Sequence, residues 1–200
     1  MVVALDRKRI VDEAVALLDA EGLESVTLRK LATRLGVQAP TLYWHLPNKA
    51  ALITAIAEEV LTPSPAIPLT AGERWQDWLI ALATRLRTAL LAHPDGARVV
   101  SMAQLSHNMA AISELAMKTL VEQGLSLHRA RLTVLTVERF TIGYALEEQA
   151  PRPPAEDFDL TAYTEAYPTV IAGITEYFAP GRTPDDLFHE CVTLVVEGPG

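Results

Sequence analysis

The segment 27–49 concentrates side chains that can form paired hydrogen bonds or present a flat apolar surface. The Arg29 guanidinium can donate two parallel hydrogen bonds to a guanine, and the Gln38 amide can pair in the same manner with an adenine. The methyl group of Thr41 can contact the methyl group of a thymine. Together these groups predict contact with base edges in the major groove of duplex DNA.

Four further groups follow at once: Tyr43, Trp44, His45 and Lys49. Each can reach a DNA phosphate, a contact that fixes the register of a protein on the duplex. The helix that carries Tyr43 and Trp44 is barely two turns long, so the two adjacent aromatic rings cannot both be buried. The alternative is a helical protein-interaction module without specific DNA binding, in which the two rings form the binding hot spot.

Local signals place these groups on a helix-turn-helix. Thr27 can cap a short helix, Gly36 can end it in a left-handed conformation, and Pro40 suits the first turn of the next helix. The glycine also allows the sharp turn that a helix-turn-helix needs. The apolar residues that can pack the two helices together are Leu31, Leu35, Val37 and Leu42.

The rest of the chain also shows helical periodicity and no alternating strand pattern. Asp6 can cap a first helix that ends at Gly22, and Asn48 can cap a helix over 49–61. A proline-rich connector, 62–68, and an exposed loop, 150–161, interrupt the pattern. Further helices are expected near 71–92, 107–123, 127–149, 163–178 and 184–197. The expected fold is all-α, with about three helices before helix 49–61 and about six after it.

The acidic residues are concentrated in the part of the chain that follows residue 50. The 200 residues carry a net charge of −8, but residues 1–50 hold seven basic and six acidic side chains, whereas the remainder holds ten basic and nineteen acidic ones. DNA contact must therefore use the first part. We expect a DNA-binding headpiece over residues 1–49 and a helical core over 50–200, with helix 49–61 as the lever between them.

Composition argues against several other classes of protein. The single cysteine, Cys191, excludes an internal disulfide framework and fits a reducing cytosol. The N-terminus lacks the order of a secretory signal, and no apolar run approaches the ~18 residues of a membrane helix, so a cytoplasmic location without membrane contact is expected. No glycine-rich phosphate loop is present, and His189-Glu190 lacks the second histidine of a zinc helix. We expect no enzymatic activity and no cofactor.

The run from Thr27-Leu28-Arg29-Lys30-Leu31-Ala32 through Leu35-Gly36-Val37-Gln38-Ala39-Pro40-Thr41-Leu42-Tyr43-Trp44-His45 to Asn48-Lys49 resembles the signature of the tetracycline repressor (TetR) family, in the version of its tetracycline-repressor subgroup. The resemblance implies a dimeric, ligand-responsive repressor of transcription that binds a palindromic operator. It also implies that Arg29, Gln38, Ala39, Pro40, Thr41 and Tyr43 face bases, while Thr27, Trp44, His45 and Lys49 face phosphates. The family archetype has a carboxylate where Gln38 stands and an amide where Ala39 stands, so a different operator sequence is expected.

The resemblance also implies a small-molecule inducer bound in the core. The archetype's magnesium-binding histidine corresponds to Val100, which cannot ligate a metal, and one further carboxylate, Glu147, makes a weak magnesium site alone. We therefore expect no metal and an inducer other than magnesium–tetracycline. The expected ligand-contacting positions are Leu82, Leu86, Val100, Ala103, Ala116, Met117, Val134, Arg139 and Glu147. Leu82, Leu86, Val100 and Met117 at helical spacing are equally typical of a plain core, and Arg139 needs a carboxylate such as Glu138 or Glu114, or an anionic ligand.

Two-fold assembly is expected through the last two long helices, 127–149 and 184–197. Leu187, Cys191, Leu194 and Val195 fall on one side of the final helix, and Phe188 and Val192 widen its apolar surface. Two such helices from each chain would form a four-helix bundle. The alternative is that these residues close the core of a single chain. On the family analogy, an inducer stabilises a core geometry that moves helix 49–61 and spreads the two headpieces.

Overall fold

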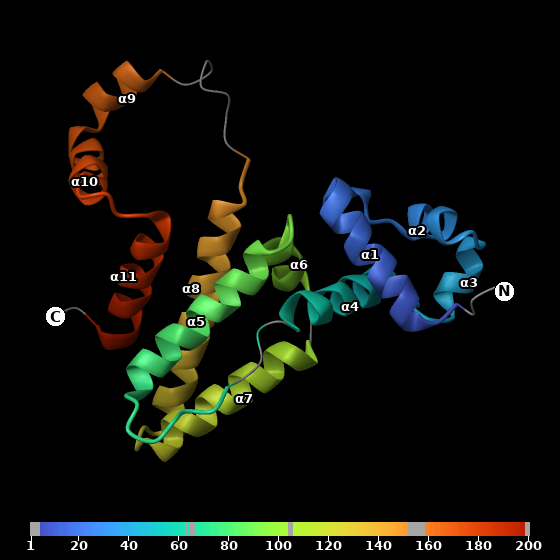
Figure 1. Cartoon of the computed structure of the whole chain (residues 1–200), viewed down its shortest axis with the longest axis horizontal. Helices are drawn as coiled ribbons and strands as arrows, with labels where there is room; N and C mark the ends of the chain where they lie inside the picture. The colour runs from blue at the N-terminus through green and yellow to red at the C-terminus, as the bar shows by residue number, and fades with distance from the viewer. Residues whose placement is uncertain (1–4, 63, 65–66, 104–105, 152–158, 199–200) are drawn as a thin grey trace.

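The computed structural model describes residues 5–62, 64, 67–103, 106–151 and 159–198, and all its regular structure is helical (Figure 1). The first part contains α1 (Arg7–Glu21), a 3₁₀ turn (Leu23–Ser25), α2 (Leu28–Leu35), α3 (Ala39–Tyr43) and α4 (Lys49–Leu61). The second part contains α5 (Trp75–Leu91), α6 (Gly96–Met102), α7 (His107–Glu122), α8 (Leu127–Glu148), α9 (Leu160–Ala166), α10 (Pro168–Phe178) and α11 (Pro184–Glu197). The all-α fold predicted from the sequence is confirmed.

The predicted start and stop signals of the headpiece helices are present. The side chains of Asp6, Thr27 and Asn48 each accept a backbone hydrogen bond from the first turn of α1, α2 and α4, respectively. Gly36 ends α2 in the left-handed region at φ 67°, where a residue with a side chain would be strained. The third helix begins at Ala39, and Pro40 lies in its first turn as predicted.

Helices α5, α7, α8 and α11 pack together beside the headpiece, and α4 joins the two parts by packing against α6 and α7 (Figure 1). One apolar cluster runs from α1 through α4 into α6, and a second fills the space between α5, α7, α8 and α11. Helix α5 begins at Trp75 rather than near residue 71, because residues 70–73 form a turn in which the Glu73 carboxylate accepts hydrogen bonds from Thr70. Parts of the predicted connector 62–68 and loop 150–161 lie outside the described residues.

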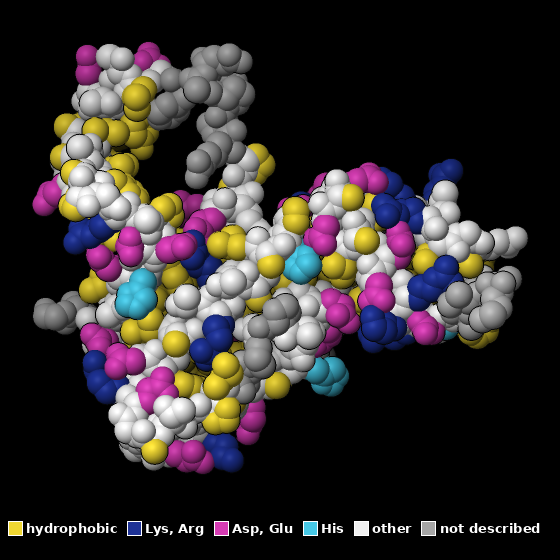
Figure 2. Space-filling model, in the orientation of Figure 1, with side chains coloured by type: hydrophobic (Ala, Val, Ile, Leu, Met, Phe, Trp, Pro, Cys, Tyr) yellow, Lys and Arg dark blue, Asp and Glu magenta, His cyan; other side chains and the backbone are white. Residues whose placement is uncertain are grey.

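The predicted helix 163–178 is two helices. Pro168 has no N–H to donate, and the chain breaks at Tyr167 between α9 and α10. The described residues show seven helices after α4, where about six were expected. No residue of α9 or α10 is buried, and the pair arches away from the other helices (Figure 1). Figure 2 shows apolar side chains along this arch; the exposed ones include Tyr167, Val170, Ile174 and Phe178.

A buried arginine side chain links three helices of the core. Arg87 of α5 is 6 % exposed, and its guanidinium donates to Glu148 of α8 at 2.5 and 2.7 Å and to Asp185 of α11 at 2.8 Å. The guanidinium carbon also lies 4.9 Å from the ring centre of Phe188. These carboxylates raise the pKa of Arg87 further above its ordinary value despite burial. No helix in the described part of the chain has the length and apolar character to cross a bilayer.

Candidate DNA-binding surface and ligand pocket

The short α3 is held to α2 by apolar side chains on one side only. Leu31 and Leu42 are fully buried between the helices, and Leu46 is buried just beyond α3. Every polar group that was predicted to contact DNA therefore lies on the other side. Tyr43 is 51 % exposed and Trp44 is 89 % exposed, which confirms that the two rings are not core residues.

The ten predicted DNA-contacting residues share one surface property: none is buried. Ala39 and His45 are half-buried, and the others are exposed, namely Thr27, Arg29, Gln38, Pro40, Thr41, Tyr43, Trp44 and Lys49. Basic and acidic side chains alternate over this end of the molecule (Figure 2).

Ion pairs separate the headpiece cations into two groups. Lys30 is hydrogen-bonded to Glu21, and Arg34 to Glu13, so α1 already neutralises both charges. The side chains of Arg29 and Lys49 form no ion pair or hydrogen bond with any described residue. A phosphate or a base can therefore bind Arg29 or Lys49 without breaking an existing ion pair.

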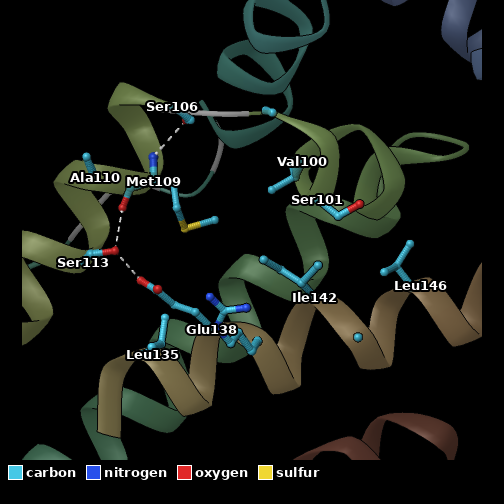
Figure 3. A pocket seen from close by; sticks show the side chains of 13 residues that line it. Val100, Ser101, Ser106, Met109, Ala110, Ser113, Leu135, Glu138, Ile142 and Leu146 are labelled. Carbon is cyan, nitrogen blue, oxygen red and sulfur yellow. Dashed lines mark hydrogen bonds between the residues drawn. The ribbon is translucent and has the colours of Figure 1, made fainter. Parts of the chain in front are cut away.

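A cavity of about 500 Å³ opens between α6, α7 and α8 (Figure 3). From α6 and the start of α7 come Val100, Ser101, Ala103, Ser106, Met109, Ala110 and Ser113. From α8 come Leu135, Glu138, Arg139, Ile142, Gly143 and Leu146. The lining is apolar apart from the serines and the two adjacent charged residues, which is typical of a pocket for a small organic molecule.

The predicted ligand-contacting residues fall into three places. Val100, Ala103 and Arg139 line the cavity. Leu82, Leu86, Ala116 and Val134 are buried around a narrow gap next to it, which has room for about 10 Å³. Met117 is half-buried against the second core cluster and Glu147 is exposed, and neither lines either space.

One sequence expectation about charge needs correction. Arg139 was expected to need a carboxylate such as Glu138 or Glu114, or an anionic ligand, but its side chain is exposed at the pocket and forms no ion pair among the described residues. Among the described residues, the buried cation is instead Arg87.

Glu138 is the carboxylate of the pocket, and sequence reasoning considered it only as a partner for Arg139. Its Oε1 lies 2.5 Å from the Ser113 hydroxyl of α7 (Figure 3). Burial raises the pKa of the Glu138 carboxyl, and the Ser113 hydroxyl and the Arg139 charge offset part of that effect. The signal that could have found it is the spacing of Leu135, Glu138, Ile142 and Leu146, which places them on one face of a helix.

The donor set of the pocket does not suit magnesium. A magnesium site uses several oxygen ligands, including one or two carboxylates. Within the described residues, no three His, Cys, Asp or Glu side chains gather in a way that could hold a metal ion. Glu138 offers one carboxylate, which is hydrogen-bonded to Ser113, and Val100 offers none.

Polar contacts tie the pocket wall to α4. The Glu58 carboxylate accepts hydrogen bonds from the backbone N–H groups of His107 at 2.6 Å and Asn108 at 2.9 Å. The Asn108 side chain donates in turn to the Glu58 carbonyl at 2.8 Å. Ser106 accepts from the next N–H, that of Met109, at 3.1 Å. The free N–H groups at the start of α7 are thus satisfied partly by the helix that leads to the headpiece.

A second set of polar contacts joins the headpiece directly to the turn before α6. The Asp95 carboxylate accepts from the Leu23 N–H at 2.9 Å, and the His93 ring lies 2.7 Å from Asp19. Asp95 is left-handed at φ 60°, and a side chain at Gly96 would place its Cβ 2.2 Å from the Leu90 carbonyl. This tight turn therefore requires glycine, and the turn sets the position of Asp95 against the end of α1.

Two family models match the chain in succession. Residues 10–56 match the model of bacterial regulatory proteins of the tetR family, and residues 67–198 match the model of the tetracyclin repressor-like C-terminal domain. Among curated proteins, the chain is similar to the tetracycline repressor protein class D of Escherichia coli, with 37 % identity over 78 % of this chain and 75 % of that one.

Solved structures give the same result. A possible TetR family transcriptional regulator from Streptomyces coelicolor A3(2) superposes with a TM-score of 0.83 and 31 % identity, covering 96 % of this chain and 98 % of that one. BioQ, solved with its double-stranded DNA operator, superposes with a TM-score of 0.66 and 31 % identity over 73 % of this chain and 87 % of that one.

Proposed function

Because this chain belongs to the tetracycline repressor family of bacterial transcriptional regulators, we propose that it represses transcription as a dimer on a near-palindromic operator and leaves the DNA when a small molecule binds its core. The single observation that carries the DNA-binding half of this proposal is the exposed face of α2 and α3. There Arg29 and Trp44 stand free in solvent beside a buried Leu31–Leu42 contact.

The headpiece, residues 1–49, supplies the contacts with DNA. Arg29, Gln38, Ala39, Pro40, Thr41 and Tyr43 are the residues proposed to read base edges, with α3 in the major groove. Thr27, Trp44, His45 and Lys49 are proposed to bind phosphates and fix the register. The exposure of all but Ala39 and His45 supports this assignment.

The dimer is proposed to form through α8 and α11. Phe188 and Val192 are buried within one chain, so these two residues belong to the core of the single chain and not to the proposed dimer surface. Leu194 is nevertheless 60 % exposed on α11, and Leu132 is 46 % exposed on α8. The unburied helices α9 and α10 support the same conclusion, since short isolated helices are marginal in water and need a packing partner. Two-fold symmetry then requires half-sites about 34–36 Å apart on the DNA.

The inducer is proposed to bind in the cavity between α6, α7 and α8, and not to be magnesium–tetracycline. Val100 and the other apolar lining residues support this proposal, as does the fact that no three His, Cys, Asp or Glu side chains gather among the described residues in a way that could hold a metal ion. The residues proposed to contact the inducer include Val100, Ala103 and Arg139. Leu82, Leu86, Ala116 and Val134 lie behind them and are proposed to shape the cavity wall.

The proposed mechanism is a shift between two populations of the core. An inducer that binds better to one arrangement of α6 and α7 changes the position of α4, because Glu58 holds α4 to the first turn of α7. Helix α4 then moves the headpiece through their shared apolar cluster. The core spans residues 50–200 in this proposal, with α4 as its lever.

The test of the DNA-binding proposal is selection of bound sequences from random duplexes, followed by two matched variants. Arg29→Ala should weaken binding to the selected duplex by about 1–3 kcal/mol and relax the preference at one base pair. Lys49→Ala should weaken binding to all duplexes about equally and lower the salt slope by about one unit. If Arg29→Ala changes neither affinity nor sequence preference, the assignment of the reading surface is wrong.

A further inference from the structure

The pocket between α6, α7 and α8 contains one acidic side chain in a mostly apolar lining. Of the described residues that line it, Glu138 and Arg139 carry charge. Arg139 is exposed, so water stabilises its guanidinium. Glu138 is half-buried and points across the cavity wall toward Ser113 (Figure 3). A carboxylate that is partly withdrawn from water and forms no ion pair with a described residue is unfavourable, so a ligand cation can stabilise Glu138.

The hydrogen bonds around Ser113 are compatible with a neutral, protonated Glu138 in the empty pocket. The Ser113 hydroxyl oxygen lies 3.0 Å from the Met109 carbonyl and 2.5 Å from Glu138 Oε1. A hydroxyl group has one hydrogen to donate, so it cannot serve both acceptors at once. When Ser113 donates to Met109, the short contact with Glu138 needs a proton from the carboxyl group. Burial, which raises the pKa of Glu138, favours this neutral form.

We propose that the inducer pocket takes a mainly apolar molecule bearing one protonated amine, and that Glu138 binds the ammonium group. Where Glu138 holds its proton in the empty pocket, binding transfers that proton to solvent, and the carboxylate accepts hydrogen bonds from the ammonium. Such a charge-assisted bond in a desolvated site is stronger than one between neutral groups. The leucine, isoleucine and methionine side chains around it would cover the apolar body. This inference rests on the cavity being the inducer site.

Three probes with one ring system and different charges test it: 9-(aminomethyl)anthracene, 9-(hydroxymethyl)anthracene and anthracene-9-carboxylate. Their affinities for the full-length protein are measured by fluorescence titration. The amine should bind about tenfold more tightly than the alcohol, and the carboxylate more weakly than both. Glu138→Gln, which keeps the shape and hydrogen-bonding capacity of the side chain, should remove the preference for the amine over the alcohol.

The matched control is Glu147→Gln, which neutralises an exposed carboxylate on the same helix and should change none of the three affinities. Equal binding of the amine and the alcohol, or an amine preference that survives Glu138→Gln, would overturn the inference while leaving the pocket in place. So would tighter binding of the carboxylate that disappears in Arg139→Gln, which would indicate an anionic ligand. If Ile142→Trp, which fills the cavity, affects no probe, the cavity is not the ligand site and the proposed function fails with the inference.

Discussion

The headpiece and the core pocket present their functional side chains in opposite ways. On the headpiece, Arg29 and Trp44 lie in solvent on two short helices whose buried sides are fixed by a few leucines. In the pocket, Glu138 and Ser113 are half-buried and come from two different helices. A charge in solvent contributes to DNA binding through many weak, salt-dependent contacts. A charge withdrawn from water has a larger individual effect and can distinguish one ligand from another.

The two regions are joined by polar contacts as well as by apolar packing. Glu58 connects α4 to the wall of the pocket, and Asp95 connects the turn before α6 to Leu23 in the 3₁₀ turn after α1. Gln149, just after α8, fixes that turn to α8: its amide nitrogen donates to the carbonyl of His93 at 2.8 Å, while its oxygen accepts from the Ala97 N–H at 3.1 Å. Movement in the pocket therefore has two routes to the headpiece.

The largest effect on operator binding by the headpiece should come from a substitution in the core, far from the DNA-binding surface. Leu194→Arg places a charge on the exposed apolar position of α11, where it should prevent dimerisation. Two linked headpieces gain about 10²–10⁴ in affinity over one, so operator binding should fall by that order. Light scattering and a gel shift with the selected duplex measure the two effects. His189→Arg, at an exposed polar position of the same helix, is the control. A monomeric wild-type protein at tens of micromolar would contradict the proposed dimer.

A second substitution should lower the stability of the core and leave the DNA-contacting residues unchanged. Arg87→Ala removes the guanidinium that joins α5 to Glu148 and Asp185, and should lower the free energy of unfolding by about 3 kcal/mol. Arg98→Ala breaks an exposed pair with Glu24 and should cost less than about 0.5 kcal/mol. Urea denaturation measures both. Equal costs for the two variants would show that burial of Arg87 adds nothing.

The headpiece could be predicted because its signals are local. The Thr27 cap, the Gly36 turn and Pro40 act within a few residues of their own positions, and the structure confirms all three. The exposure of Tyr43 and Trp44 followed from the size of their helix. The failure at α9 and α10 had a local signal too: Pro168 stands within the predicted helix 163–178, and its missing N–H should have indicated a break.

The polar contacts of the core could not be predicted from the sequence because they join distant parts of the chain. Glu148 is 61 residues from Arg87 and Asp185 is 98 residues from it, so periodicity alone could not show that this arginine is buried and paired. The same holds for Glu138, which meets Ser113 from another helix. The family resemblance placed Val100, Ala103 and Arg139 at the cavity. It gave no sign that the carboxylate next to Arg139 is the less exposed of the two charges.

Coupling between the regions can be tested without a ligand. Glu58→Ala removes the acceptor for the first N–H groups of α7 and should lower stability by about 1 kcal/mol, as loss of a helix cap does. Because linkage is reciprocal, operator DNA should change hydrogen exchange at His107 and Asn108 in the wild type and much less in the variant. Glu59→Ala, on the exposed side of α4, should behave as the wild type. An identical response to DNA in Glu58→Ala would show that α7 is not coupled through this contact.

The smallest predicted effect concerns Glu138 and pH. Burial raises its pKa in the folded state above the ordinary value of 4.5, so the folded protein binds this proton more tightly than the unfolded chain does. The stability that Glu138 contributes is therefore present below pH 4.5 and is lost as the pH rises through the raised pKa. Glutamine does not titrate. The melting temperature of Glu138→Gln relative to the wild type should accordingly increase between pH 5 and pH 7.5, as measured by differential scanning calorimetry. Arg139, the other charged residue that lines the pocket, is present in both proteins, so its own effect cancels in the difference between their melting temperatures. A difference that stays constant with pH would mean that Glu138 ionises as freely as in the unfolded chain, and the pocket would then hold no desolvated acid to attract a cation.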